Sequence, residues 1–154
     1  MDLSSLLKPR GVRVLTDVSS KKRLLQSIAE TAETLVGLPA STIFDALQER
    51  ESLGPTGVGH GVALPHARLA SLSEVQGAFL RLEKPIDFDS ADRQPVDLFF
   101  ALFAPADTGV AHLKALALVS RTLRDETLRA KLRANSDPAT LYTILTAGTE
   151  TEAA

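Results

Sequence analysis

The chain contains no cysteine and no tryptophan, and its 154 residues include only six phenylalanines and one tyrosine. The lack of cysteine excludes disulfides, thiol catalysis and cysteine-ligated zinc. The low aromatic content and the net charge of -2 disfavour nucleic-acid binding through base stacking or phosphate neutralisation. No apolar run approaches the roughly 18 residues that span a bilayer, so we expect no membrane insertion.

The beginning of the chain lacks the basic start, apolar segment and cleavage site of a secretory signal, so we expect a cytoplasmic protein. Hydrophobic residues make up 44% of the chain and charged residues 23%, which is typical of a globular domain. We expect residues 1–154 to form a single domain, with a core over about 3–147 and a frayed tail at 149–154.

The spacing of the apolar residues predicts a mixture of helices and strands. Helices are expected over 20–36, 41–51, 110–123, 126–134 and from 138 onward. Strands are expected over 11–15, 62–64, 75–82 and 96–103. This order favours an α/β sandwich in which helices flank a small mixed β-sheet.

The segment from Arg50 to His66 is the most informative part of the chain. Four glycines, at positions 54, 57, 59 and 61, precede the apolar run 62–64, which Pro65 ends. Pro65 restricts its own backbone and that of the residue before it, so His66 follows a rigid strand end. Sites in α/β sheets gather at strand ends, and an imidazole can accept a proton, a metal or a phosphoryl group. A histidine without a function is the simpler alternative.

The glycines themselves suggest a loop whose backbone N–H groups approach an anion, with Gly57 and Gly59 as candidates and the Thr56 hydroxyl as an added donor. Neither GxxxxGK[ST] nor GxGxxG is present, so a nucleotide-binding loop is not predicted. The alternative is a flexible loop without a ligand.

Arg50 and His112 are further candidates. Arg50 lies three positions after Leu47 and seven after Ile43, on the apolar face of its predicted helix. A guanidinium there needs an anion such as a phosphoryl group, or it must reach solvent past the helix end. His112 falls in the first turn of the predicted helix 110–123, where it could donate a hydrogen bond to a phosphoryl oxygen.

Two other groups of residues receive simpler interpretations. The three histidines show no i, i+4 pair and no carboxylate partner, so a metal site is not predicted, and His60 is read as a residue that the loop tolerates. The positive run Lys21-Lys22-Arg23 opens the first long helix, and we interpret it as a solvated face, with docking to an acidic partner as the alternative.

The chain resembles the IIA component of the bacterial phosphotransferase system, of the fructose–mannitol type, and within it the nitrogen-regulatory branch called enzyme IIA-Ntr. The resemblance spans roughly residues 3 to 147. It rests on the run from Arg50 to His66 and on the segments Lys84-Pro85-Ile86-Asp87-Phe88, Gln94-Pro95-Val96-Asp97-Leu98, Pro105-Ala106-Asp107 and His112-Leu113.

This resemblance implies that His66 accepts a phosphoryl group from a phosphorylated HPr-type carrier of the NPr kind. It implies that His112 contacts the phosphoryl group and that Arg50 orients it. It also implies regulation of potassium transport, stress or nitrogen responses, and no metal or cofactor, because the donor N–P bond is already activated. Ala67-Arg68 stands where Gly-Lys is expected, and Pro55 is a second departure from the family pattern.

Two alternatives remain open at this point. A sugar-specific IIA component would pass phosphate to a IIB transporter subunit. A binding module would no longer transfer phosphate at all, although the joint presence of Arg50, His66 and His112 argues against it.

Overall fold

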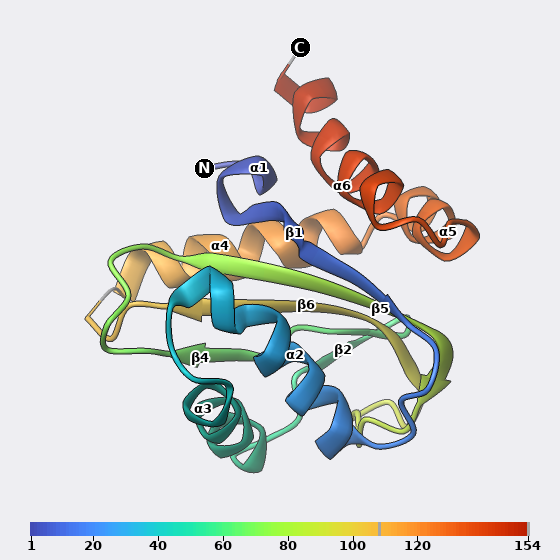
Figure 1. Ribbon diagram of the computed structural model, residues 1–154. Coiled ribbons are helices and arrows are strands. Elements are labelled where there is room, and N and C mark those ends of the chain that lie inside the picture. Colours follow the sequence, from blue (N-terminus) through green and yellow to red (C-terminus); the bar gives the residue numbers. More distant parts are fainter. Residues whose placement is uncertain (108, 154) are drawn as a thin grey trace.

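A mixed β-sheet lies between two layers of helices (Figure 1). The computed structural model describes the backbone of residues 1–107 and 109–153 and the side chains of residues 1–107 and 109–147. Within this part the sheet has six strands in the order β1-β5-β6-β3-β2, and β4 also pairs with β6. The strands are β1 (Leu7–Leu15), β2 (Gly57–Gly59), β3 (Val62–Ala63), β4 (His66–Arg68), β5 (Gln76–Ile86) and β6 (Val96–Ala104).

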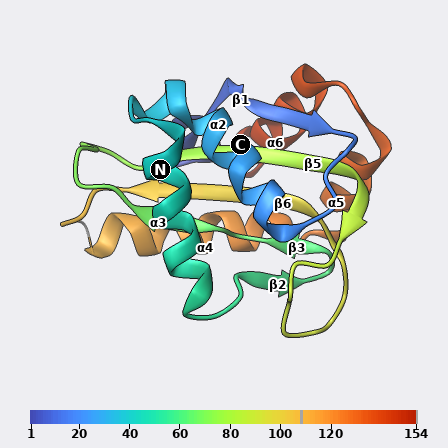
Figure 2. The same ribbon diagram turned by 60° about the horizontal axis from the view of Figure 1, so that its bottom comes forward.

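The helices cover both faces of the sheet. They are α1 (Leu3–Leu6), α2 (Lys21–Val36), α3 (Ala40–Ser52), α4 (Gly109–Leu123), α5 (Glu126–Ala134) and α6 (Pro138–Ala153). Figure 2 shows α2 and α3 in front of the sheet, with α4, α5 and α6 behind it. The predicted α/β sandwich with a mixed sheet is confirmed.

Strand β6 explains why the sheet needs helices on both sides. Its alternate residues Phe99, Ala101 and Phe103 belong to the core under α2 and α3. Leu98 and Phe100 belong to the core under α1, α4, α5 and α6. Because successive side chains of a strand point to opposite faces, a strand that is apolar throughout must be covered twice.

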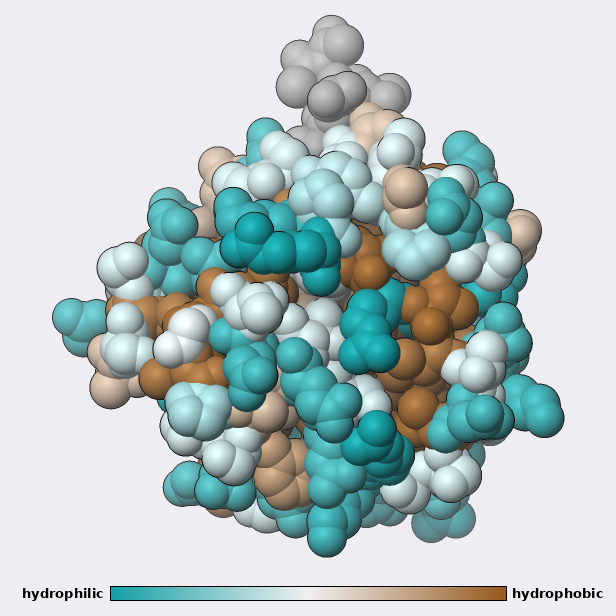
Figure 3. Space-filling view, in the orientation of Figure 1, coloured by the Kyte–Doolittle hydropathy of each residue, from teal (hydrophilic) through white to brown (hydrophobic). Residues whose placement is uncertain are grey.

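The predicted helix over 20–36 shows how local signals set its ends. The Ser20 side chain accepts a hydrogen bond from the Arg23 N–H and caps the amino end of α2. Gly37 ends the helix in the left-handed conformation, with φ of 72°. On the outer surface, hydrophilic side chains separate the apolar patches of this side of the molecule (Figure 3).

The glycines around His60 serve a tight hairpin. Gly59 pairs with Val62, so that His60 and Gly61 form the two-residue turn between β2 and β3. Both turn residues have positive φ, 58° and 75°, as the hairpin turn that matches strand twist requires. The sequence therefore needs glycine here for the sheet itself.

Three elements were not predicted: α1, β2 and β4. Each has only three or four residues, too few to show a period of 2 or 3.6. The strand predicted over 11–15 starts earlier, at Leu7, and the strand predicted over 75–82 extends to Ile86. Helix α6 continues to Ala153, into the segment predicted to be a frayed tail.

Candidate functional site

His66 lies just after a short interruption between two strands, β3 and β4, that both pair with β6. Strands β3 and β4 both run parallel to β6, and Pro65 lies between them, its carbonyl accepting a hydrogen bond of 2.9 Å from the Leu102 N–H. His66 opens β4 opposite Leu102. This places the histidine toward the carboxyl end of parallel strands, in a hollow lined by residues of α3 and α4.

The His66 ring is held in one orientation and one tautomer. Its Nδ1 lies 2.9 Å from the Leu64 carbonyl oxygen, which can only accept, so Nδ1 carries the proton. In the neutral ring the lone pair then belongs to Nε2. The backbone thus leaves Nε2 as the ring nitrogen whose lone pair can accept a hydrogen bond or react with an electrophile.

Arg50 meets this nitrogen from the last turn of α3. Its Nε donates to His66 Nε2 at 3.1 Å, and its Nη1 donates to the Gly54 carbonyl oxygen at 2.9 Å. The sequence left open whether the guanidinium points into a site or reaches solvent past the helix end. In the structure it points toward His66. A guanidinium in this position can instead donate its hydrogen bonds to the oxygens of an anion, such as a phosphoryl group, next to His66 Nε2.

His112 approaches from the opposite side, in the first turn of α4. The centroids of the His66 and His112 rings are 5.3 Å apart, at an interplanar angle of 55°. His112 is only 5% exposed, and within the described residues its buried Nδ1 has no hydrogen-bond partner. A buried ring nitrogen without a partner is costly, and it marks a place where a ligand atom could bind.

The electrostatics of the site keep both rings neutral. Burial lowers the pKa of His66, the hydrogen bond to the Leu64 carbonyl opposes this shift, and the positive charge of Arg50 lowers the pKa further. Burial also lowers the pKa of His112, and His66 and Arg68 add to that shift. A neutral imidazole is the form that can attack an electrophile.

These shifts predict a pH-dependent loss of stability. Because the folded pKa of each ring lies below its ordinary value of 6.5, the unfolded chain binds protons more readily. The stability is therefore complete above about pH 6.5 and declines as the pH falls through that value toward the folded pKa. Urea unfolding between pH 5 and 8 measures the decline, and the double variant His66→Gln/His112→Gln should flatten it. The same slope in the double variant would assign the decline to other groups.

The three side chains line one hollow of about 480 Å³. Its other lining residues are Ala46, Glu49, Leu53, Ala67, Arg68, Leu113 and Leu116. Leu53 is 80% exposed and Leu113 64%, so apolar side chains stand at the rim of a polar centre. Exposed apolar side chains around a polar centre are typical of a surface that a protein partner covers.

The structure does not bring Thr56, Gly57 and Gly59 into this hollow. The Thr56 hydroxyl is buried and donates to a Glu51 carboxylate oxygen. Gly57 and Gly59 lie in β2, where they pair with β3. The anion-binding loop expected from the glycines is therefore not assembled beside His66, because sheet pairing and a buried carboxylate occupy these residues.

Two residues of the site region escaped sequence reasoning. Arg68 lies two positions after His66 on β4, hence on the same side of the strand, and its Nη1 donates to the Ala106 carbonyl oxygen at 3.1 Å. Glu51 is buried beside Arg50. The spacing of Ile43, Leu47 and Glu51 at i, i+4 and i+8 is the signal that could have placed Glu51 on the inner face of α3.

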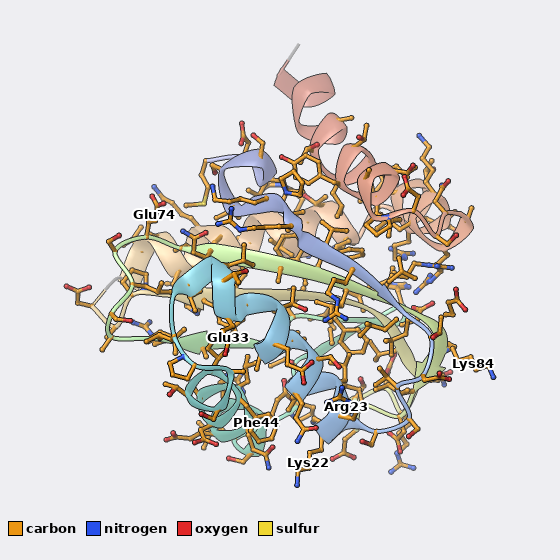
Figure 4. The ribbon with its side chains drawn as sticks, in the orientation of Figure 1. Lys22, Arg23, Glu33, Phe44, Glu74 and Lys84 are labelled. Atoms are coloured by element: carbon orange, nitrogen blue, oxygen red, sulfur yellow. The ribbon has the colours of Figure 1, made fainter. Side chains whose placement is uncertain are left out.

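The positive run at the amino end of α2 is only partly a solvated face. Lys22 points away from the fold (Figure 4), and Arg23 pairs with Glu30 on the exposed surface of the helix. Lys21 instead turns inward and pairs with Glu51 at 2.9 Å.

Metal and membrane signals are absent from the part of the chain that the structure describes. There, no group of three or more histidine, aspartate or glutamate side chains could hold a metal ion. Among the same residues, none of the helices combines the length and the apolarity that crossing a bilayer requires.

The family model described as "Phosphoenolpyruvate-dependent sugar phosphotransferase system, EIIA 2" matches residues 5–148. The chain belongs to this family. Members of the EIIA 2 family are components of a phosphotransfer system, which fits a neutral histidine between an arginine and a second histidine.

Relatives of this EIIA 2 chain include two proteins named "Nitrogen regulatory protein". The one from Bradyrhizobium diazoefficiens is 46% identical over 145 residues, covering 94% of this chain and 95% of the relative. The one from Escherichia coli strain K12 is 43% identical over 147 residues, covering 95% and 90%. The crystal structure of nitrogen regulatory protein IIA-Ntr from Neisseria meningitidis matches with a TM-score of 0.86 and 34% identity, covering 94% of this chain and 99% of that one.

Proposed function

We propose that this EIIA 2 chain is a phosphohistidine carrier of the nitrogen-regulatory type, in which His66 accepts a phosphoryl group from a phosphorylated HPr-type protein. The observation that carries the proposal is the fixed ring of His66. Nδ1–H donates to the Leu64 carbonyl, and the lone pair of Nε2 accepts from Arg50. The His112 ring lies next to the His66 ring. His66, His112 and Arg50 are the proposed site residues, whereas Thr56, Gly57 and Gly59 receive no phosphate-binding role.

The chemical step follows from this geometry. The Nε2 lone pair of His66 attacks the phosphorus in line, a new N–P bond forms, and the N–P bond of the donor histidine breaks, its electron pair returning to the donor ring. The Nδ1 proton stays on the bond to the Leu64 carbonyl. Because the transition state of phosphoryl transfer is loose, the protein contributes mainly positioning and charge stabilisation.

Arg50 and His112 supply the stabilisation. The Nε bond of Arg50 to His66 Nε2 must open as the phosphorus arrives, and the released guanidinium then lies next to the phosphoryl oxygens. The arriving group brings about two negative charges into a site that holds neutral rings. Its charge favours protonation of His112, whose Nδ1 could then donate to an oxygen.

The regulatory assignment is supported by the relatives named nitrogen regulatory protein, which align with nearly the whole chain. A PTS fructose-specific EIIA component of Haloferax volcanii is 41% identical but covers 66% of this chain. We therefore favour regulation over sugar uptake, with an NPr-like donor and target proteins in potassium transport or stress responses, as the resemblance implies. The proposed setting is the cytoplasm.

The test is phosphotransfer with purified proteins. The chain is incubated with phosphoenolpyruvate, enzyme I and either HPr or NPr, and bound phosphate is followed with its acid lability. Acid-labile label, with a ³¹P resonance of an Nε2-phosphohistidine, supports the carrier function. Onward transfer to a fructose or mannitol IIB protein would favour the sugar-specific alternative, and no label from any carrier would favour a binding module.

Replacing His112 with alanine is expected to leave the fold intact and to slow transfer by about 100-fold, the lower end of the loss expected when one donor to a developing charge is removed. The slow step is measured by mixing phosphorylated carrier with the variant and following label in a single turnover. Unchanged transfer would show that His112 only fills space beside His66.

A further inference from the structure

Glu51 is a buried carboxylate that the proposed chemistry does not use. Its side chain is 4% exposed, although it directly follows Arg50 in α3. A charge removed from water in this way is costly unless it is paired and hydrogen-bonded. Glu51 meets that demand through Lys21 Nζ at 2.9 Å, the Thr56 N–H at 3.3 Å and the Thr56 hydroxyl.

Lys21 connects this carboxylate to the layer formed by α2. It is the first residue of α2, and its side chain is 24% exposed. Its ammonium group lies 4.6 Å from the centroid of the buried Phe88 ring, a cation–π geometry. The amino end of α2 and the carboxyl end of α3 are thus joined through one carboxylate.

The segment between Glu51 and Thr56 carries the second hydrogen-bond acceptor of Arg50. The Gly54 N–H donates to the Glu51 carbonyl oxygen at 3.2 Å, and the Gly54 carbonyl oxygen accepts from Arg50 Nη1 at 2.9 Å. Apolar packing does not anchor this segment, because Leu53 is 80% exposed and Ser52 and Pro55 are exposed as well. Backbone hydrogen bonds hold it at Leu53, Gly54 and Thr56, and the attachment of Thr56 to the Glu51 carboxylate is the side-chain contribution.

We infer that Lys21, Glu51 and Thr56 are positioning residues that hold the Gly54 carbonyl, and through it the Arg50 guanidinium, against His66. Two bonds orient the guanidinium: Nη1 to Gly54 and Nε to His66 Nε2. If Gly54 shifts, Nη1 loses its acceptor and the Nε bond loses its direction. The catalytic meaning of this network rests on the proposed function, but the network itself can be tested in the unphosphorylated protein.

The test uses four variants of the full chain. Thr56→Val removes the hydroxyl without changing charge or branching, and Thr56→Ser restores it. Glu51→Gln removes the charge that pairs with Lys21. Glu30→Gln is the matched control, because Glu30 also pairs with a cation of α2 but lies on the surface, 49% exposed. Thermal unfolding and a ¹H–¹⁵N spectrum establish that each variant is folded.

The first measurement is the Arg50 Nε–H signal in NMR spectra. Its hydrogen exchange with water reports the bond to His66, and a merely structural role of the network would not change it. The second measurement is the His66 pKa. Because Arg50 lowers this pKa, a released guanidinium should raise it in Thr56→Val, where no charge has been removed. The third is the rate of phosphotransfer over a range of carrier concentrations, resolved into kcat and KM for the carrier.

We expect faster exchange of the Arg50 Nε–H and a higher His66 pKa in Thr56→Val, with Thr56→Ser and Glu30→Gln close to the unmodified chain. We expect kcat to fall by about 10-fold or more in Thr56→Val and Glu51→Gln at unchanged KM, because small misplacements of a positioned group cost rate. Folded variants with an unchanged Arg50 signal would overturn the positioning role. If the unmodified chain takes no phosphate, the proposed function fails, while the NMR measurements still decide the positioning.

Discussion

Replacing His66 with alanine is expected to reduce phosphate uptake by on the order of 10³-fold or more, because the variant lacks the only nucleophile that the proposed step uses. The ring contributes two features that no neighbour replaces. Its Nδ1–H bond to the Leu64 carbonyl fixes the tautomer, and Nε2 is thereby the nitrogen that attacks. In the proposed step Arg50, which donates to this nitrogen, and the buried His112, whose ring lies next to that of His66, bind phosphoryl oxygens and do not attack.

The measurement is the transfer of labelled phosphate from a phosphorylated carrier, with a urea melt to show that the variant is folded. His60→Asn is the matched control, since His60 lies at the tip of the β2–β3 hairpin and asparagine tolerates its positive φ of 58°. This control should accept phosphate like the unmodified chain. If His66→Ala carries acid-labile label at the level of the unmodified chain, the phosphoryl acceptor is another residue.

Replacing Arg50 with lysine is expected to slow transfer by about 100-fold, although the charge is retained, because a lysine ammonium cannot reproduce the planar fork of a guanidinium. Arg50 binds two acceptors at once, His66 Nε2 through Nε and the Gly54 carbonyl through Nη1. In the proposed step, the fork allows one nitrogen to stay on the Gly54 carbonyl while another turns to the phosphoryl group.

The loss should appear in kcat, with KM for the carrier nearly unchanged, since the apolar rim at Leu53 and Leu113 remains. Measuring the transfer rate over a range of carrier concentrations separates kcat from KM. Transfer at the normal rate in Arg50→Lys would mean that positive charge alone suffices. A higher KM at constant kcat would mean that Arg50 serves docking of the carrier.

Local sequence signals were sufficient for the long elements and for the type of fold. Ser20 and Gly37 mark the ends of α2, and the apolar run of β6 indicates a strand covered on both faces. These features depend on neighbouring residues, so a short stretch of sequence contains them. The short strand β4 lacks such signals, and only its pairing with β6 makes His66 the first residue of a strand.

The sequence by itself determined the three chemical groups of the candidate site, because the Arg50–His66 segment and the position of His112 identify them without coordinates. Only the tertiary structure decided which groups meet. It joined His66 and His112 across 46 positions of chain, and it assigned Gly57 and Gly59 to strand pairing and Thr56 to Glu51. The physical reason is that residue type and spacing specify local geometry, whereas the partner of a buried polar group depends on which segments the packed core brings together.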